Sequence, residues 1–275
     1  MGPRPSMITV TQLLRYPLKG GRARVEPLLP LDEFGPAYDR RWMAVDTGGN
    51  QITQREVARL CLVSARPVDE GLELSAPGRS PLVVLLVDAA AGARPVRIWK
   101  DRCDAIDQGD QAAEWIGSWL GRECRLVYMP ASTHRRTDPA YDPAGGRVSF
   151  ADGYPLLLAG EASLEALNRR LAEPLPMSRF RPNVVVRGAE PFEEDTWRRF
   201  RIGPLRFDAV KPCARCQVTT IDQETAIAGR EPLATLARFR KRGSGVLFGM
   251  NVVHRDRGAI RVGDRVTIET REAID

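Results

Sequence analysis

The sequence has few of the residues that build most protein metal sites. Among its 275 residues are two histidines, His134 and His254, and five cysteines. An odd number of irregularly spaced cysteines is not the pattern of a disulfide framework. Cys213 and Cys216 have the CxxC spacing of half a zinc site. A second CxxC or CxxH pair, which the four ligands of structural zinc require, is absent. The sequence therefore disfavours structural zinc.

The sequence also lacks a long apolar run and an N-terminal leader. The longest candidate, PLVVLLVDAAAG, is interrupted at Asp88, and its pattern predicts a buried strand followed by a turn. The N-terminal stretch MGPRPSMITV has no apolar segment of the kind that a secretory signal carries. We therefore expect a protein without a membrane span, located in the cytoplasm, whose cysteines are thiols.

An excess of basic residues raises the question of a nucleic-acid partner. The chain has 41 Lys and Arg against 35 Asp and Glu, a formal net charge of +6. The excess is spread along the whole chain with acidic residues between, and aromatics clustered with Lys and Arg on one strand are scarce. Nucleic-acid binding is therefore disfavoured, and a nucleic-acid-binding barrel would show itself by salt-sensitive retention on DNA or RNA resins.

What the sequence does contain is a long series of short strands separated by Gly, Pro and Asp. Residues 7–18 predict a strand that enters the turn KGGR, and residues 40–56 predict a hairpin around DTGGN. Residues 198–212 predict a bent strand or hairpin that leads into the cysteine pair. The pattern indicates a mainly β protein with a few helices, an α+β fold. It is divided into two units that meet within residues 120–135, the first of them barrel-like.

Three segments have helical features. Residues 110–121 predict a helix with Asp110 as its N-cap, and residues 161–173 predict another with Ser163 as its cap. Residues 231–240 predict a short helix with Pro232 in its first turn. Residues 131–150 have no periodicity, and a loop of this length is expected to be either functional or disordered.

The cysteine pair lies in KPCARCQVTTID, and the residues around it leave several interpretations open. A thioredoxin-type redox pair begins a helix, whereas the β-branched residues at 218–221 predict that a strand continues. Two ordinary cysteines remain possible. Arg215 and Lys211 are cations that would stabilise a thiolate, the form that ligates metals. A single thiolate without a histidine partner suits a metal whose other ligands come from a cofactor.

These motifs, taken in order, resemble the MOSC-domain proteins. KPCARCQVTTID, GREPLATLARFR and LFGMNVV resemble the C-terminal half of that family, most closely the branch of the mitochondrial amidoxime-reducing component and its bacterial relatives. LLRYPLKGG and YDRRWMAVDTGGNQITQRE resemble its N-terminal β-barrel. The resemblance covers nearly the whole chain. It implies a MOSC N-terminal β-barrel domain at residues 5–125 packed on a MOSC β-barrel domain at residues 126–272.

The resemblance implies a molybdenum cofactor, in which the metal is held by the dithiolene of a pyranopterin and by one protein cysteine. By its place in the motif, Cys216 is the expected metal ligand and catalytic residue, and Cys213 is a bystander. Asp152 matches a carboxylate near the metal that could relay protons. The expected cofactor contacts, which would include cations for the pterin phosphate, are Lys19, Arg40, Arg181 and Asn183.

The sequence departs from the family pattern at three places. Gly20 follows the lysine, Gly153 and Tyr154 follow the aspartate, and Ala214 precedes Arg215, where many relatives have hydroxyl residues. Cofactor contacts at these positions would have to come from backbone N–H groups. The larger Tyr154 is expected to narrow the substrate entrance.

The resemblance implies an oxidoreductase that removes oxygen from small N-hydroxylated compounds such as amidoximes, hydroxylamines and N-hydroxylated bases. Because the chain carries no iron–sulfur domain, a separate electron donor is expected: a flavoprotein, a ferredoxin or a b-type cytochrome. The loop containing Arg135 and Arg136 is expected to attract an acidic carrier of this kind. The alternative function is a non-catalytic module that carries the molybdenum cofactor or a sulfur group.

Overall fold

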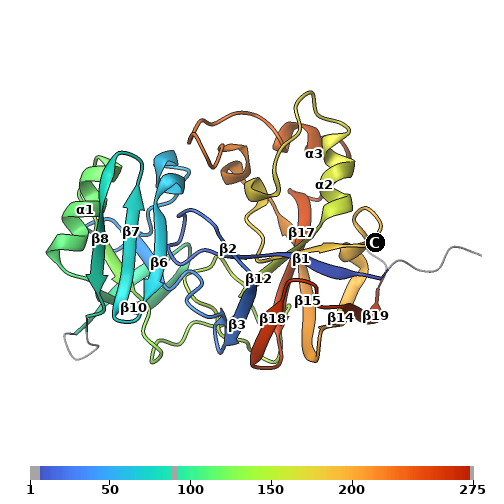
Figure 1. Ribbon diagram of the computed structural model, residues 1–275, viewed down its shortest axis with the longest axis horizontal. Coiled ribbons are helices and arrows are strands. Elements are labelled where there is room, and N and C mark those ends of the chain that lie inside the picture. The colour runs from blue at the N-terminus through green and yellow to red at the C-terminus, as the bar shows by residue number, and fades with distance from the viewer. Residues whose placement is uncertain (1–6, 88–91, 273–275) are drawn as a thin grey trace, which may run out of the picture.

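The computed structural model describes residues 7–87 and 92–272, and strands dominate these residues as the sequence predicts (Figure 1). One large sheet has the order β19-β14-β15-β17-β12-β13-β1-β2, with β16 added on β17. Its neighbours are antiparallel in every pair except β12 with β13. Its strands are β1 (Thr9–Arg15), β2 (Arg24–Glu26), β12 (Leu156–Gly160), β13 (Val184–Arg187), β14 (Trp197–Ile202), β15 (Leu205–Ala214), β16 (Lys241–Arg242), β17 (Gly245–His254) and β19 (Val266–Arg271).

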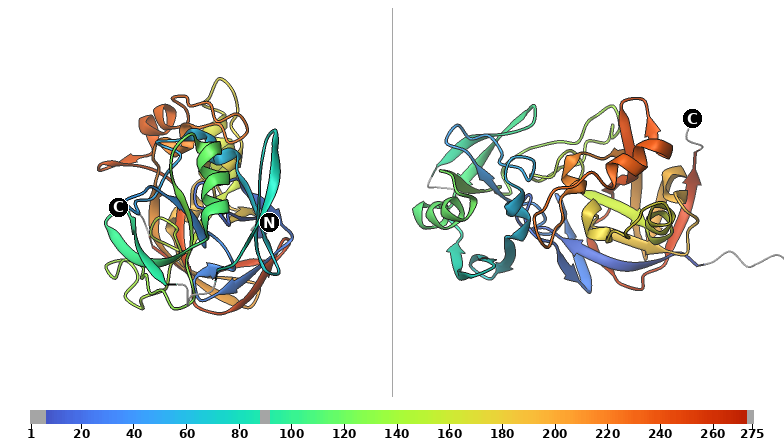
Figure 2. Two further views of the ribbon diagram at one scale, coloured as in Figure 1. Left: turned by 90° about the vertical axis from the view of Figure 1, so that its left-hand side faces the viewer. Right: turned by 90° about the horizontal axis from the view of Figure 1, so that it is seen from above.

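Smaller sheets and short helices complete the described fold. The sheet orders are β5-β11-β10-β9, β18-β3-β4 and β6-β7-β8. Their strands are β3 (Leu28–Asp32), β4 (Gly35–Pro36), β5 (Trp42–Val45), β6 (Ser64–Val68), β7 (Gly71–Ala76), β8 (Arg79–Leu85), β9 (Ala93–Ile98), β10 (Asp101–Asp107), β11 (Arg125–Tyr128) and β18 (Gly258–Arg261). The helices are α1 (Asp110–Leu120), α2 (Glu161–Asn168) and α3 (Leu233–Phe239), with 3-10 turns η1 (Ala58–Leu62), η3 (Met177–Phe180), η4 (Glu193–Thr196) and η5 (Gln217–Thr220). Figure 2 shows α1 at the opposite end of the molecule from α2 and α3.

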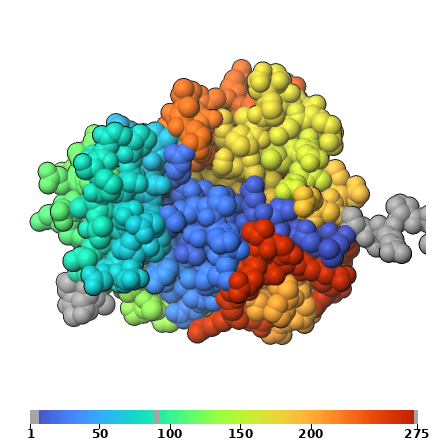
Figure 3. Space-filling model, viewed as in Figure 1, coloured from blue at the N-terminus to red at the C-terminus, as the bar shows by residue number. Residues whose placement is uncertain are grey.

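Strand pairing crosses the predicted boundary between residues 125 and 126. The N-terminal strand β1 pairs with β13, with Val10 opposite Val186, and β3 pairs with β18. In Figure 3 the blue N-terminal residues accordingly lie between the cyan residues and the yellow and red ones. The division into 5–125 and 126–272 stays a prediction, and residues 5 and 6 lie outside the described part of the chain. The pairing joins the two halves of the chain through the first strands.

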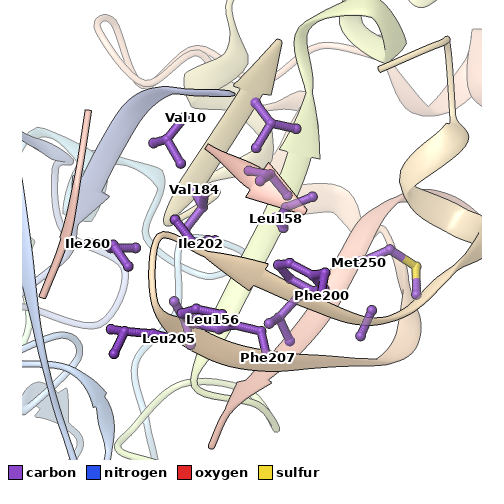
Figure 4. Packing of buried hydrophobic residues seen from close by; sticks show 14 of the residues in the cluster. Val10, Leu156, Leu158, Val184, Phe200, Ile202, Leu205, Phe207, Met250 and Ile260 are labelled. Carbon is purple, nitrogen blue, oxygen red and sulfur yellow. The ribbon is translucent and has the colours of Figure 1, made fainter. Parts of the chain in front are cut away.

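The largest apolar core lies against the long sheet, and Figure 4 shows its side chains pointing toward one another. Phe200 and Ile202, two residues apart in β14, are buried as period-two patterning requires, and a register irregularity between Trp197 and Phe200 brings Trp197 into the same core. Among them Trp197 and Phe200 have ring centroids 5.6 Å apart, and Phe207 of β15 stacks on Phe200 at 5.5 Å. A second core lies under α1, which buries Ala112, Ile116 and Leu120 at helical spacing. Each of these cores contributes a residue to the functional site described below, Leu156 from the first and Ile52 from the second.

The predicted helices are present, but their predicted caps are wrong. The N-cap of α1 is Gly109, and the Asp110 carboxylate accepts a hydrogen bond from Arg125 Nη1 at 2.7 Å instead. In α2 the N-cap is Gly160, and the buried Ser163 hydroxyl contacts both oxygens of Glu194 at 2.7 and 2.8 Å. In both helices, the side chain that the local sequence pattern predicted as the N-cap instead bonds a charged residue distant in the sequence.

Two further predictions need correction, and the alternatives for the loop at residues 131–150 are narrowed. The strand β8 exists, but its pattern is mostly exposed rather than buried, and part of the turn predicted after it (residues 88–91) lies outside the described residues. Residues 217–220 form the turn η5 rather than a continuing strand. Hydrogen bonds hold the loop at 131–150, since the buried Asp142 accepts from Thr137 and Gly146 within the loop and from Arg255 outside it. This favours order over disorder, and a function for the loop stays a prediction. In the described ranges, we find no helix with the length and apolar character needed to span a membrane.

Candidate functional site

A single cleft brings together all six residues that the sequence singled out. About 920 Å³ of empty space, part of it open solvent, lies between the N-terminal hairpins and the large sheet. The predicted residues on its walls are Lys19, Arg40, Asp152, Arg181, Asn183 and Cys216. Residues 170 positions and more apart therefore share one site, as a function common to them requires.

The two cysteines of the pair differ in their surroundings. Cys216 directly precedes η5 and is partly exposed, and its sulfur has no hydrogen-bond partner among the described residues. Arg215 turns toward the other cysteine, since its Nη1 lies 2.8 Å from Cys213 Sγ. The described residues contain no group of three or more His, Cys, Asp or Glu placed to hold a metal. A metal at Cys216 would thus take its other ligands from outside the protein.

Two arginines of the cleft pack against the ring of one buried tyrosine. The guanidinium carbons of Arg40 and Arg181 lie 4.2 and 4.3 Å from the centroid of the Tyr16 ring. The ring is fully buried, and its hydroxyl donates to the carbonyl of Pro182 at 3.0 Å. Both arginines have positive φ, 48° and 56°, which is uncommon for residues other than glycine. Tyr16 therefore positions two cations at the cleft wall.

The charges of this wall are not balanced within the protein. Arg40 pairs with the buried Asp39, but Arg181 has no carboxylate within ion-pairing distance among the described residues. Burial lowers the pKa of Arg181 to about 10, with the neighbouring Tyr16 opposing the shift. Arg215 also lines the cleft, and its contacts are with Cys213 Sγ and the carbonyl of Phe180 rather than with a carboxylate of the described residues. Cations without a carboxylate partner fit an anionic ligand, and a guanidinium can contact phosphate with two parallel hydrogen bonds.

Lys19 and Asp152 form an ion pair at the cleft. Lys19 Nζ donates to Asp152 Oδ1 at 2.6 Å and to the carbonyl of Phe150 at 2.7 Å. Burial lowers the pKa of Lys19, although Asp152 opposes this shift. Desolvation by the cleft walls would raise the pKa of Asp152, but the ammonium of Lys19 outweighs it and holds that pKa well below its ordinary value. Asp152 is therefore ionised at neutral pH, with 70% of its side-chain surface exposed.

Asn183 lines the cleft, but its polar atoms are already engaged. Its Nδ2 donates to Leu14 O and Asp39 Oδ1, both at 3.1 Å. Its Oδ1 accepts from Arg40 Nη1 at 3.0 Å and from Leu157 N at 3.2 Å. An amide has two donors and two acceptor positions, so none remains free. The predicted direct contact with a cofactor would need one of these bonds to break, and the geometry favours Asn183 as the residue that orients Arg40.

Comparison with known proteins agrees with the sequence motifs. Family models describing a "MOSC N-terminal beta barrel domain" and a "MOSC domain" match residues 7–123 and 145–267. The chain is 33% identical to "Mitochondrial amidoxime-reducing component 1" of Mus musculus, over 94% of this chain and 81% of the relative. The chain belongs to the MOSC-domain family. It is also 37% identical to "Mitochondrial amidoxime reducing component 2" of Rattus norvegicus, over 84% of this chain and 73% of that one.

A second kind of MOSC relative is longer than this chain. The "Molybdenum cofactor sulfurase" of Oryza sativa subsp. japonica is 31% identical over 97% of this chain, but the match covers 34% of the rice protein. The likeness therefore concerns about a third of that relative.

Sequence reasoning missed several residues that line the cleft of this MOSC protein or support its lining from behind. The side-chain amides of Gln54 and Gln223 form a buried reciprocal pair, with both N–O distances 3.1 Å, and Gln223 Oε1 also accepts from Arg181 Nη1 at 3.0 Å. Trp99 lines the mouth and donates to Asp152 at 3.0 Å. Asp39 lies behind Arg40. Nothing in the sequence near Gln54, Gln223 or Trp99 indicates that these residues belong to a ligand site. Asp39 is distinguished only by its burial, which the sequence does not show.

The predicted role of Arg135 in attracting an acidic carrier is wrong. Its side chain is buried, pairs with Asp101 and donates to the carbonyls of Ser149, Ala151 and Asp152. It supports the backbone of the Asp152 segment from within. Arg136 is exposed and remains available to a partner.

Gly20 and Tyr154 are two of the positions at which the sequence departs from the MOSC pattern, and both lie on the cleft. Gly20 has φ +78°, and a Cβ at this position would lie 2.6 Å from Leu60 Cδ2, so a hydroxyl residue would require both a strained backbone and a shift of Leu60. Its carbonyl accepts from Gln54 Nε2 at 2.7 Å. Tyr154 lines the cleft with its hydroxyl buried and unpartnered among the described residues. That it narrows the substrate entrance stays a prediction.

Alkaline titration tests the buried Tyr16. Burial raises the pKa of Tyr16 to about 12, although the charges of Arg181 and Arg40 oppose the shift. The folded state therefore holds the phenol proton more tightly than the unfolded state, whose pKa is near 10. This stabilisation is fully present below pH 10 and is lost as the pH rises through 12. From pH 9 to pH 11, we expect the free energy of unfolding to fall by about 1.4 kcal/mol more in the wild type than in Tyr16→Phe, measured by urea titration. Equal losses would show that Tyr16 ionises at its ordinary pKa.

Proposed function

We propose that this MOSC-domain protein is a molybdenum-cofactor-dependent oxidoreductase that reduces N-hydroxylated compounds. The observation that carries the proposal is one cleft in which a thiol without a protein partner, Cys216, lies on the same walls as the unpaired cations Arg181 and Arg215. A soft ligand and a set of phosphate-binding donors are the features that a metal held by a phosphorylated pterin requires. The names of the mouse and rat relatives support the same reaction class.

The residues present fit such a cofactor. Cys216 would ligate the metal, and Arg181 and Arg40 would bind the phosphate. Lys19 would add a point charge if its ammonium reaches the ligand from its pair with Asp152. Asn183 would act through Arg40. When bound, the cofactor supplies two-electron redox chemistry, while the protein positions it and the substrate.

The reaction converts an N–OH group, two electrons and two protons into an N–H group and water. The Lys19–Asp152 pair is the cleft group able to hold a proton near the reacting atoms, since Lys19 carries it at Nζ and Asp152 Oδ1 accepts the hydrogen bond. The predicted proton relay through Asp152 would therefore use the two residues together. The electrons would come from a separate flavoprotein, ferredoxin or b-type cytochrome. The predicted cytoplasmic location stays a prediction, because the mouse and rat relatives are named as mitochondrial.

The proposal is tested by metal content together with turnover. Protein produced in a molybdenum-replete host is expected to contain about one molybdenum atom per chain, because one unpartnered cysteine sulfur is available as a ligand. It should reduce benzamidoxime with reduced viologen as the electron source. Elemental analysis and product chromatography are the measurements. Active protein with less than about a tenth of an atom per chain would contradict the proposal.

A second candidate function is a carrier of the molybdenum cofactor or of a sulfur group without turnover. The likeness to the rice molybdenum cofactor sulfurase favours it, although the match covers about a third of that protein. A carrier would contain molybdenum yet reduce no N-hydroxylated compound with any electron donor. It would also transfer the cofactor to a cofactor-free molybdenum enzyme. The same preparation therefore separates the two functions.

A further inference from the structure

The cleft has an exposed tryptophan on its mouth. Trp99 lies in the turn between β9 and β10 and lines the cleft with 38% of its surface exposed. By contrast, Trp42, Trp115 and Trp197 are buried. Leaving an indole ring in water forgoes the favourable burial of a large apolar surface. An exposed ring on a cleft wall is therefore a candidate contact for a ligand that covers it.

The indole ring is held in place from several sides. Its Nε1 donates to Asp152 Oδ1 at 3.0 Å, and the Trp99 carbonyl accepts from Arg97 Nε at 2.9 Å. The guanidinium of Arg55 lies 4.5 Å from the ring centroid. The backbone has φ 53°, a left-handed conformation that is strained for a bulky residue. These contacts hold the ring in one orientation before any ligand binds, which lowers the entropy that binding would cost.

A hydrogen-bond acceptor lies beside this aromatic surface. Asp152 Oδ1 receives both Trp99 Nε1 and Lys19 Nζ, whereas Oδ2 accepts no hydrogen bond from the described residues. The side chain is 70% exposed, so Oδ2 is accessible from the cleft. A ligand that satisfies both features has a flat π-system to stack on Trp99 and an N–H group to donate to Asp152. An amidoxime attached to an aromatic ring, or an N-hydroxylated aminobase, has both.

We propose that Trp99 is a substrate-binding residue that selects aromatic over aliphatic N-hydroxylated compounds. This inference rests on the proposed function for its substrate class. Trp99 would stack on the ring of the substrate while Asp152 Oδ2 accepts the neighbouring N–H. An aliphatic amidoxime offers the N–H donor alone and leaves the indole face uncovered.

The test compares two substrates that differ only in the ring. Benzamidoxime and acetamidoxime are assayed with the molybdenum-loaded protein and with its Trp99→Leu and Trp99→Phe variants. In Trp99→Leu, kcat/KM for benzamidoxime is expected to fall roughly 5- to 100-fold, the range of one aromatic stacking contact. For acetamidoxime it should change less than about twofold. Trp99→Phe loses the Nε1–H bond to Asp152 but keeps an aromatic ring. Because stacking on the ring is the proposed interaction, this variant should retain most of the wild-type kcat/KM for benzamidoxime.

Trp119 provides the matched control. It also has an arginine, Arg59, 4.3 Å from its ring centroid, but it is not on the cleft. Trp119→Leu is expected to leave the ratio of the two kcat/KM values unchanged. An equal fall for both substrates in Trp99→Leu, or no fall for either, would overturn the inference. So would a change of the ratio in Trp119→Leu as large as that in Trp99→Leu.

A binding measurement separates this inference from the proposed function. Calorimetry with benzamidine, the product of benzamidoxime reduction, does not depend on turnover. We expect benzamidine to bind at least about fivefold more weakly to Trp99→Leu than to the wild type. If this loss occurs in a protein that reduces neither substrate, the proposed function fails and the aromatic site stands. If benzamidine binds equally to both proteins, the aromatic site fails whether or not the protein reduces amidoximes.

Discussion

Replacing Cys216 with alanine is expected to remove molybdenum from the protein and to lower benzamidoxime reduction by more than about 100-fold. Even residues that only support metal ligands are typically worth 10- to 100-fold in affinity or activity. Cys216 has no hydrogen-bond partner among the described residues, so its loss leaves no buried polar group unpaired. The fold should therefore keep its stability while metal content falls. Elemental analysis, steady-state kinetics and urea titration measure the three quantities.

The matched control is Cys213→Ala, three residues away on the same cleft. The contact of Cys213 is with Arg215 Nη1 at 2.8 Å, and Arg215 keeps its bond to the carbonyl of Phe180 at 2.6 Å when the sulfur is removed. Molybdenum content and turnover should thus stay within about twofold of the wild type. If both variants lose metal equally, two sulfurs hold it, and the single-thiolate site is wrong.

The positions of most strands could be predicted from the sequence, whereas their long-range pairing could not. Alternation of apolar residues such as Phe200 and Ile202, together with Gly and Pro at the turns, is a local signal. The pairing of Val10 with Val186 joins residues far apart in the chain, and nothing in either segment identifies the other. For that reason the sequence predicted a boundary at residues 125 and 126 that strand pairing crosses.

The turn η5 was missed because side-chain hydrogen bonds outweighed strand propensity. Thr219 Oγ1 donates to Cys216 O at 2.9 Å, and Thr220 Oγ1 donates to Gln217 O at 2.9 Å. Threonine favours strands through its branched Cβ, but its hydroxyl can instead bond a carbonyl three residues back and stabilise a tight turn. The turn directs the chain away from the sheet immediately after Cys216. Composition alone gave no means to decide between these two preferences of threonine.

The candidate site was predictable through the motifs, but its supporting residues were not. Lys19, Arg40 and Arg181 carry the charge that a phosphate would need, and motif order predicted them. Gln223 orients Arg181, and Trp99 borders Asp152, through contacts that depend on distant backbone geometry. The sequence also gave Asn183 a direct cofactor contact, whereas its four hydrogen bonds are internal. Residue type indicated the chemistry, and only the structure shows which groups are already paired.

Asp39→Ala is expected to destabilise the fold by about 3 kcal/mol, the lower end of the range for breaking a buried pair, because it leaves the partly buried cation of Arg40 without its partner. Asp39 is 2% exposed, and its carboxylate accepts hydrogen bonds from Arg40 Nη1, from Tyr16 N at 2.8 Å and from Asn183 Nδ2 at 3.1 Å. Alanine removes all of these acceptors at once. Urea titration of the purified variant measures the loss. Phosphate affinity should fall as well, since Arg40 and Asn183 lose the group that holds them.

Two comparison variants show whether burial of the charge is the cause. Glu73→Ala breaks the exposed ion pair between Glu73 of β7 and Arg66 of β6, and it should change the free energy of unfolding little because water screens such pairs. The double variant Asp39→Ala/Arg40→Met removes both buried charges and should recover part of the stability that Asp39→Ala loses, since the uncompensated guanidinium is gone. If the double variant is as unstable as the sum of its single substitutions, the two side chains act independently. The loss in Asp39→Ala would then come from the unpaired backbone N–H of Tyr16 rather than from the charge of Arg40.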